Sequence, residues 1–299
     1  MTATATSYDV GAVGAAPPRS WVVRNLRDSL RYGRTRAGLV ITGLIVLVAV
    51  LGPLVAPHSP TALVGAPFGG ASATAPLGTD YVGEDVLSRV LAGGRFILWM
   101  AVASGLIGVA GGTTLGVVAG FSRKWADEAI MRSLDVLLAV PVLVFVLLFI
   151  SMLGPSPVLI VVLVGVAWMP TVSRTVRAAT LEIAQREFIE AAQVIGTPRR
   201  RIVLHELLPN LMTLILVELG LRCAWSVSLV SVISFLGFGI SPPRADWGLM
   251  INENLIGVSV QPWAVLAPVV CIALFSIGVS LLADGLSQAV SGIDRTAAS

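Results

Sequence analysis

The apolar positions of this sequence form long continuous runs, divided by short segments that hold most of the charged residues. A helix needs about 20 mostly apolar residues to cross a bilayer. One charge-free stretch, between Asp135 and Arg174, is interrupted by Gly154-Pro155-Ser156-Pro157, a turn signal that divides it into two spans. The pattern therefore predicts an all-α integral membrane protein with six membrane-spanning helices. The other four spans are expected at residues 37–57, 96–122 and 210–236 and between Glu253 and Asp284.

The composition agrees with this pattern, because 56% of the 299 residues are apolar and only 12% are charged. Soluble domains carry roughly 25% charged residues, so this chain lacks the charge that a water-exposed surface needs. A soluble enzyme, a disordered chain and a nucleic-acid-binding protein are thereby excluded. Cys223 and Cys271 lie inside apolar runs and show no spacing typical of disulfides or metal ligands.

Positive charges predict the orientation of the spans. If the N-terminus is cytoplasmic, most Lys and Arg residues fall in cytoplasmic segments, and only Arg89, Arg95 and Arg244 fall in external ones. This asymmetry obeys the positive-inside rule and predicts that both termini are cytoplasmic.

The expected organisation starts with a cytoplasmic tail in which apolar residues and arginines alternate at helical spacing around residues 20–36. Such a pattern favours a basic amphipathic helix on the inner leaflet, although a solvated arginine leader would also fit. The predicted segments are an N-terminal tail (1–36), a first membrane helix (37–57), an external loop (58–94), a core of membrane helices (95–288) with a cytoplasmic loop (181–209), and a C-terminal tail (289–299).

Small residues recur at every fourth position of the second span. This spacing places them on one helix face, where they allow the backbone of a neighbouring helix to approach closely. The neighbour can belong to this chain or to another. The residues are Gly108, Gly112, Gly116 and Gly120.

Catalytic chemistry is not visible in the sequence. The only lysine, Lys124, follows Arg123 rather than glycine, so the phosphate-binding loop of an ATPase is missing. His58 and His205 show neither metal-ligand spacing nor a nucleophilic partner. We therefore expect no catalytic residue, no metal site and no cofactor in this chain. Transport remains, with energy from an ion gradient or from another polypeptide.

One pair of charges lies deep within a predicted span. Glu218 and Arg222 are four residues apart, so they can form an ion pair on one helix face and offset part of the cost of burial. Two interpretations stay open: a structural ion pair inside the bundle, or residues that line a wet translocation path.

The cytoplasmic loop before the fifth span predicts two short helices. Gly196 ends the first, and the second begins with Thr197 as its N-cap and Pro198 at its first position. Pro209 is expected to break the chain before the fifth span. Glu187 and Glu190 would present negative charge on this protrusion, and small side chains at Ala191 and Ala192 would let another protein approach the backbone.

The same segment resembles the EAA loop of ABC-importer permeases, which docks into a cleft of the ATPase subunit. The family usually has isoleucine or histidine where this chain has Glu206, with His205 just ahead of it. The matching residues are Glu190, Ala191, Ala192, Gly196, Leu208 and Pro209.

Further stretches resemble the second, C-type permease subunit of dipeptide, oligopeptide and nickel importers. This resemblance implies a six-helix type I permease fold in a bacterial plasma membrane. It also implies that Gly78, Asp80, Asp85 and Arg89 belong to an external signature that contacts a solute-binding protein. The stretches are Pro53–Pro57 with Pro60, Leu77–Asp80 with Gly83, Asp85–Arg89 with Gly94-Arg95, Met131-Arg132 with Asp135 and Pro141, and Phe235–Gly239 followed by Pro242-Pro243 and Trp247-Gly248.

By this resemblance the chain forms half of a translocation pathway for peptides. The implied partners are a sister permease, two ATP-binding subunits that hold ATP and magnesium, an extracytoplasmic solute-binding protein and the lipid bilayer, with no nucleic acid. Two alternatives are a self-contained secondary carrier or channel and a membrane scaffold that transports nothing. The cargo stays open among dipeptides, oligopeptides, nickel chelates and haem-like ligands.

Overall fold

The computed structural model describes residues 29–30 and 32–297. The predicted basic helix of the N-terminal tail lies largely outside these residues, and residues 298–299 lie outside them too. The described part is helical apart from turns, loops and two isolated β-bridges. Its elements are α2 (Gly33–Val55), α3 (Val86–Gly120), α4 (Lys124–Leu138), α5 (Val142–Leu153), α6 (Pro157–Ala184), α7 (Glu187–Val194), α8 (Arg199–Ile202), the π-helix η2 (Val203–Leu207), α9 (Leu208–Phe235), α10 (Trp247–Asn254), the 3-10 helix η3 (Leu255–Gly257) and α11 (Trp263–Ala297).

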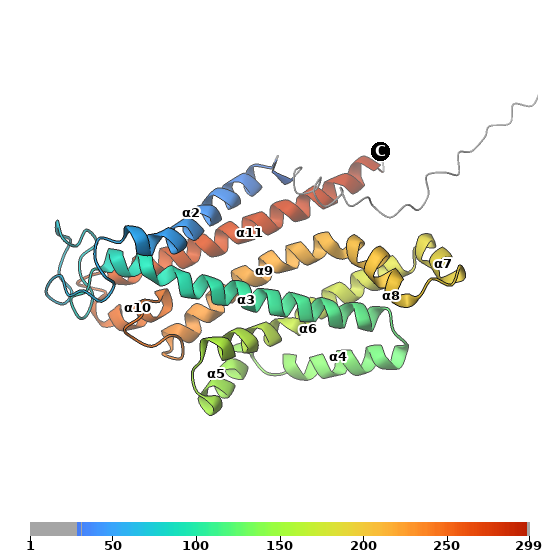
Figure 1. Cartoon of the computed structure of the whole chain (residues 1–299), viewed down its shortest axis with the longest axis horizontal. Helices are drawn as coiled ribbons and strands as arrows, with labels where there is room; N and C mark the ends of the chain where they lie inside the picture. Colours follow the sequence, from blue (N-terminus) through green and yellow to red (C-terminus); the bar gives the residue numbers. More distant parts are fainter. Residues whose placement is uncertain (1–28, 31, 298–299) are drawn as a thin grey trace, which may run out of the picture.

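The long helices run roughly along one axis and form an elongated bundle (Figure 1). α2 packs along α11, while α3 packs against both α6 and α9. α7 and α8 lie at one end of the bundle, and the loop before α3 lies with α10 at the opposite end (Figure 1). We call residues 187–207 the knob, and residues 56–85 together with 236–262 the cap.

Among the residues that the structure describes, five helices are long and apolar enough to cross a membrane, and a bent pair brings the number to as many as six. The expected turn at residues 154–157 is confirmed, since α5 ends at Leu153 and α6 begins at Pro157. The predicted third span corresponds to the bent pair of α4 and α5. α4 and α5 meet at an angle of 79°, because Pro141 lacks an N–H and disfavours helical backbone at Val140.

The second long helix begins earlier than the charge-free run suggested. Asp85 is its N-cap, and its carboxylate accepts hydrogen bonds from the N–H groups of Leu87 and Ser88. An acceptor at this position satisfies the free donors of the first turn and fixes the start of the helix at Val86. Arg89 and Arg95 therefore lie in α3, although the sequence suggested an external loop as far as residue 94.

The glycine row of α3 lies in the seam with α6, so its neighbour belongs to the same chain. A Cβ added at any of the four positions would lie 2.6–2.9 Å from the nearest atom of α6. Ser173 on α6 donates a hydrogen bond to the carbonyl of Gly112 across the seam, at 3.0 Å. Backbones this close leave no room for larger side chains. The contacts are Gly108 with Trp168, Gly112 with Val172, Gly116 with Ser173 and Gly120 with Thr180.

Candidate functional site

The knob consists of two short helices at the end of the bundle opposite the cap (Figure 1). Its base is apolar, because Ile189 of α7 and Ile202 of α8 are both 0% exposed. They belong to one buried cluster with Val176 of α6 and Leu211 of α9. Burial of an Ile side chain stabilises by roughly 1.5–3 kcal/mol. The knob is therefore fixed to two long helices and moves with them.

A tight turn connects the two helices of the knob. Gly196 has φ +84°, a conformation that glycine adopts without strain. The N–H of Gly196 donates to Gln193 O and that of Thr197 to Ala192 O, both at 3.0 Å, which is the Schellman pattern of helix termination. Both expected positions at the start of the second helix are wrong by one residue. α8 begins at Arg199, so Pro198, expected as its first residue, is the N-cap in place of Thr197.

The surface of the knob combines charge with an exposed apolar tip. Val194 is 88% exposed and Ile195 is 82% exposed, directly before the turn at Gly196. Glu187 and Glu190 are exposed in the first turn of α7, where the helix dipole favours negative charge. The sequence analysis missed the apolar tip. Its signal was a pair of large apolar residues next to a predicted helix-ending glycine, in a segment expected to face water.

The other residues of the predicted motif lie on the same protrusion. Ala191 is exposed beside Glu190, while Ala192 is half-buried against the apolar base. Leu208 and Pro209 lie at the start of α9, where the knob joins the bundle.

Pro209 does not break the chain, contrary to the expectation. Residues Arg199–Phe235 form one continuous helix of 37 residues through the π-turn η2. A π-turn widens the backbone locally, so the missing N–H of Pro209 is tolerated. Asn210 also donates its side-chain amide to Glu206 O at 2.6 Å, which adds a hydrogen bond between η2 and the first turn of α9. π-turns of this kind occur frequently at functional sites.

The deep charges Glu218 and Arg222 are paired with one another. Arg222 Nη2 lies 3.0 Å from Glu218 Oε2, and the two side chains are 11% and 8% exposed. The guanidinium also lies 5.2 Å from the ring centre of Trp168 on α6, and Trp168 Nε1 donates to Ser226 Oγ at 2.9 Å. This arrangement joins α6 to α9 and favours the structural interpretation. A role in the translocation path stays a prediction.

The cap is held together by a buried arginine. Arg89 forms ion pairs with Asp80, with Glu84 at 2.7 Å and with Glu253 of α10 at 2.8 Å. Tyr81 N–H donates to Asn254 Oδ1 at 3.0 Å, which adds a second link from the loop to α10. The loop before α3 is thus fastened to both α3 and α10.

The residues of the predicted external signature lie inside the cap, in or beside this network of ion pairs. Asp80 and Asp85 are 0% exposed, Arg89 is 2% exposed, and Gly78 is buried beside Gln261. In this conformation none of the four presents its side chain to another protein. Their burial gives them a supporting role in the cap, and a contact of this segment with a binding protein stays a prediction.

Burial also changes the titration of the cap. It raises the pKa of Glu84 and of Glu253, and the neighbouring Arg89 guanidinium opposes that rise. Asp246, the N-cap of α10, is fully buried, and burial raises its pKa as well. Three carboxylates around one guanidinium leave an excess of negative charge, which protonation relieves.

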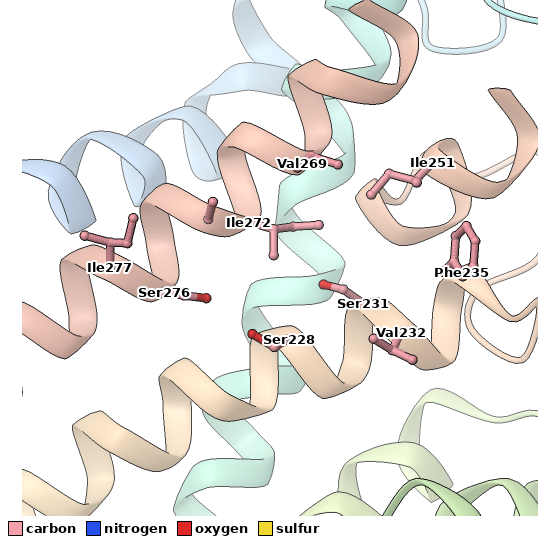
Figure 2. A pocket seen from close by; sticks show the side chains of 10 residues that line it. Ser228, Ser231, Val232, Phe235, Ile251, Val269, Ile272, Ser276 and Ile277 are labelled. Carbon is pink, nitrogen blue, oxygen red and sulfur yellow. The ribbon is translucent and has the colours of Figure 1, made fainter. Parts of the chain in front are cut away.

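A groove of about 550 Å³ separates α9 from α11 and is bordered by Ile251 of α10 (Figure 2). Its lining is mostly apolar and contains no charged side chain among the described residues. Figure 2 shows three hydroxyls, those of Ser228, Ser231 and Ser276, on the two facing helices. Ser231 Oγ donates to Val227 O of its own helix at 2.6 Å. This surface fits contact with an apolar helix or lipid rather than catalysis.

The family model for "Binding-protein-dependent transport system inner membrane component" matches residues 112–292, a range that includes the knob. The chain belongs to this family. The permease is therefore a multi-pass membrane component of an ATP-binding-cassette importer, as the sequence motifs implied, and its all-helical structure agrees with the type I permease fold.

Three relatives illustrate the similarity. The permease is 35% identical to the oligopeptide transport system permease protein OppC of Haemophilus influenzae, over 73% of this chain and 70% of the relative. It is 36% identical to the glutathione transport system permease protein GsiD of Pectobacterium atrosepticum, over 72% and 71%. The di/tripeptide transport system permease protein DppC of Pseudomonas aeruginosa is 32% identical, over 85% and 86%.

Proposed function

We propose that this permease forms half of a translocation path for peptides and receives mechanical work at the knob from a separate ATPase subunit. The exposed Val194 and Ile195, on a protrusion whose base is fully buried, carry this proposal. A rigid, apolar tip fits insertion into a cleft of another protein, since burial of each of these side chains would contribute roughly 1.5–3 kcal/mol.

The connections of the knob support a role in transmission. Through η2 the knob is continuous with α9, and only Gln185 and Arg186 separate α7 from α6. Both α6 and α9 pack on α3. α6 is also tied to α4, because Arg177 Nε lies 2.5 Å from Asp127 Oδ1. A displacement of the knob would therefore reach most of the bundle.

The names of the relatives support peptide cargo, because they refer to oligopeptides, glutathione and di- or tripeptides. The proposed assembly contains this permease, a sister permease, two ATP-binding subunits and an extracytoplasmic solute-binding protein. In the proposed orientation the knob and both termini are cytoplasmic and the cap is external. ATP and magnesium would bind to the ATPase subunits, and this chain would hold no cofactor.

Reconstitution tests the proposal. The complete assembly in proteoliposomes, supplied with its loaded binding protein, should accumulate labelled dialanine only when ATP is present on the knob side. A variant with Val194→Asp and Ile195→Asp should lose the ATPase subunits on purification and lose uptake. Arg132→Gln, at an exposed position of α4, serves as the control.

Two results would contradict the proposal. One is full assembly and uptake by the double variant. The other is uptake that persists with inactive ATPase subunits and collapses with an uncoupler, which would identify a secondary carrier.

A further inference from the structure

The charges of the cap are arranged with the acids inside. Each of its five carboxylates faces inward, toward Arg89, a helix N-terminus or neighbouring backbone. Because these carboxylates face inward, the charged side chains that remain on the surface of the cap are positive. The five are Asp80, Asp85 and Asp246, each 0% exposed, and Glu84 and Glu253, whose side chains are 14% and 8% exposed.

Two arginines at this end have no such partner. Arg95 of α3 and Arg244 of the segment before α10 are both exposed, and neither forms an ion pair with any residue that the structure describes. Arginine is disfavoured on the external side of a membrane protein. Arg89 satisfies three carboxylates, whereas neither Arg95 nor Arg244 has a carboxylate partner among the described residues.

The two arginines lie at a similar depth in the bundle. The guanidinium of Arg244 lies 5.6 Å from the ring centre of Phe96, the residue that follows Arg95. Stacking on an aromatic face leaves the N–H groups at the edge of a guanidinium free to bind a carboxylate with two parallel hydrogen bonds.

Packing of α2 against α3 shows how deep this position is. A Cβ on Gly52 would lie 2.3 Å from Leu91 O, so Leu91 is level with the last turn of α2. Arg95 is one turn further along α3, about 6 Å closer to the middle of the bundle. Arg95 is exposed at this depth, so its guanidinium is accessible to a solute or a lipid headgroup.

From this geometry we infer that Arg244 and Arg95, beside Phe96, form an oxyanion-binding site at the external mouth of the permease, and that its ligand is the carboxylate of the peptide cargo. The inference rests on the proposed function. The inference extends that function by assigning a contact to the C-terminal carboxylate, a charged group that peptides share irrespective of sequence.

A second oxyanion is available at this depth. Trp99 lies one turn beyond Arg95 on α3 and is 42% exposed, as expected of an aromatic residue near a membrane interface. The phosphate of a lipid headgroup has the same chemistry toward arginine as a carboxylate. The experiment therefore has to separate cargo, lipid and binding protein.

The three possible ligands are distinguished by initial rates of ATP-dependent dialanine uptake. These rates are measured in proteoliposomes at increasing concentrations of loaded binding protein. Arg244→Gln should lower the maximal rate about tenfold without changing the half-saturating concentration. Arg244→Lys should recover part of the rate, because it keeps the charge but loses the planar fork. Arg95→Gln should act in the same direction, and Arg123→Gln, at an exposed position just beyond the opposite end of α3, should have no effect.

Three outcomes would overturn the inference while wild-type uptake is normal. An unchanged rate in Arg244→Gln would show that no ligand is bound. A raised half-saturating concentration with an unchanged maximal rate would place the arginines against the binding protein. A defect seen only in vesicles that contain phosphatidylglycerol, and absent in phosphatidylcholine alone, would identify the lipid phosphate. A wild-type assembly that carries no peptide would instead overturn the proposed function, and the carboxylate assignment with it.

Discussion

Arg89 and Glu253 are 164 residues apart in the sequence, yet their side chains form a 2.8 Å ion pair that joins the first turn of α3 to α10. The side chain of the arginine is 3% exposed and that of the glutamate is 8% exposed. Because the loop carboxylates Asp80 and Glu84 also pair with Arg89, one guanidinium of α3 holds both segments of the cap in place.

Removal of this guanidinium should destabilise the permease strongly. Arg89→Met leaves three carboxylates without their counter-ion, and loss of one partner from a buried ionic cluster costs about 3–5 kcal/mol. Thermal unfolding of the purified chain in one detergent measures the effect. Arg244→Gln, which breaks no ion pair, is the control, and an equal melting temperature for Arg89→Met and wild type would show that the cluster is not stabilising.

The cap should become more stable as the external pH falls toward the acidic range. The pKa values of Glu84 and Glu253 are raised above the ordinary 4.5, so the folded state binds protons more tightly than the unfolded state. The stability from this binding is present below pH 4.5 and is lost as pH rises through the raised pKa values. Melting temperatures between pH 4.5 and 7.5 should show this slope in wild type, and a Glu84→Gln, Glu253→Gln double variant should reduce it to the part that the buried Asp246, whose pKa is also raised, contributes.

Two glycines should respond oppositely to alanine. At Gly116 a Cβ would lie 2.7 Å from the backbone oxygen of Ser173, so Gly116→Ala should cost about 1–3 kcal/mol through forced separation of α3 and α6. At Gly43 of α2 nothing lies within 4 Å of the added atom, and Gly43→Ala should stabilise by roughly 0.5–1 kcal/mol. Thermal unfolding compares them, and a loss at Gly43 as large as at Gly116 would argue against the seam.

Glu218 and Arg222 should behave as one unit. Glu218→Gln leaves the Arg222 guanidinium in an apolar environment and should destabilise by about 3–5 kcal/mol, whereas the double change with Arg222→Met should recover most of the loss. Melting temperature and dialanine uptake are measured together. Normal assembly and uptake by the double variant would exclude a role in the path, while normal assembly with lost uptake would support that role.

The sequence predicted those features whose causes lie within a few residues. Gly196 ends α7 and Gly154 ends α5 as expected, because a helix-terminating glycine acts through its own backbone. Apolar runs located the long helices for a similar reason. The start of α3 was missed because the charge of Arg89 resembles that of a loop residue until its partners on the loop and on α10 are known.

The candidate site was predictable in part. The motif located the knob, but the exposure of Val194 and Ile195 depends on which apolar residues the rest of the bundle buries, and Ile189 and Ile202 take that place. The prediction that Pro209 breaks the chain was wrong for a related reason. Whether a proline ends a helix depends on how the preceding turn adapts, and here the π-turn accommodates it.

The uninterrupted helix from Arg199 to Phe235 has a consequence for timing. Its 37 residues span about 55 Å at the usual rise of 1.5 Å per residue, from the knob to the segment that leads into α10. Because a continuous helix moves as a rigid body, a tilt of one end displaces the other end in the same step. The two ends of the translocation pathway would then change conformation together through this one helix, without a separate element to connect them.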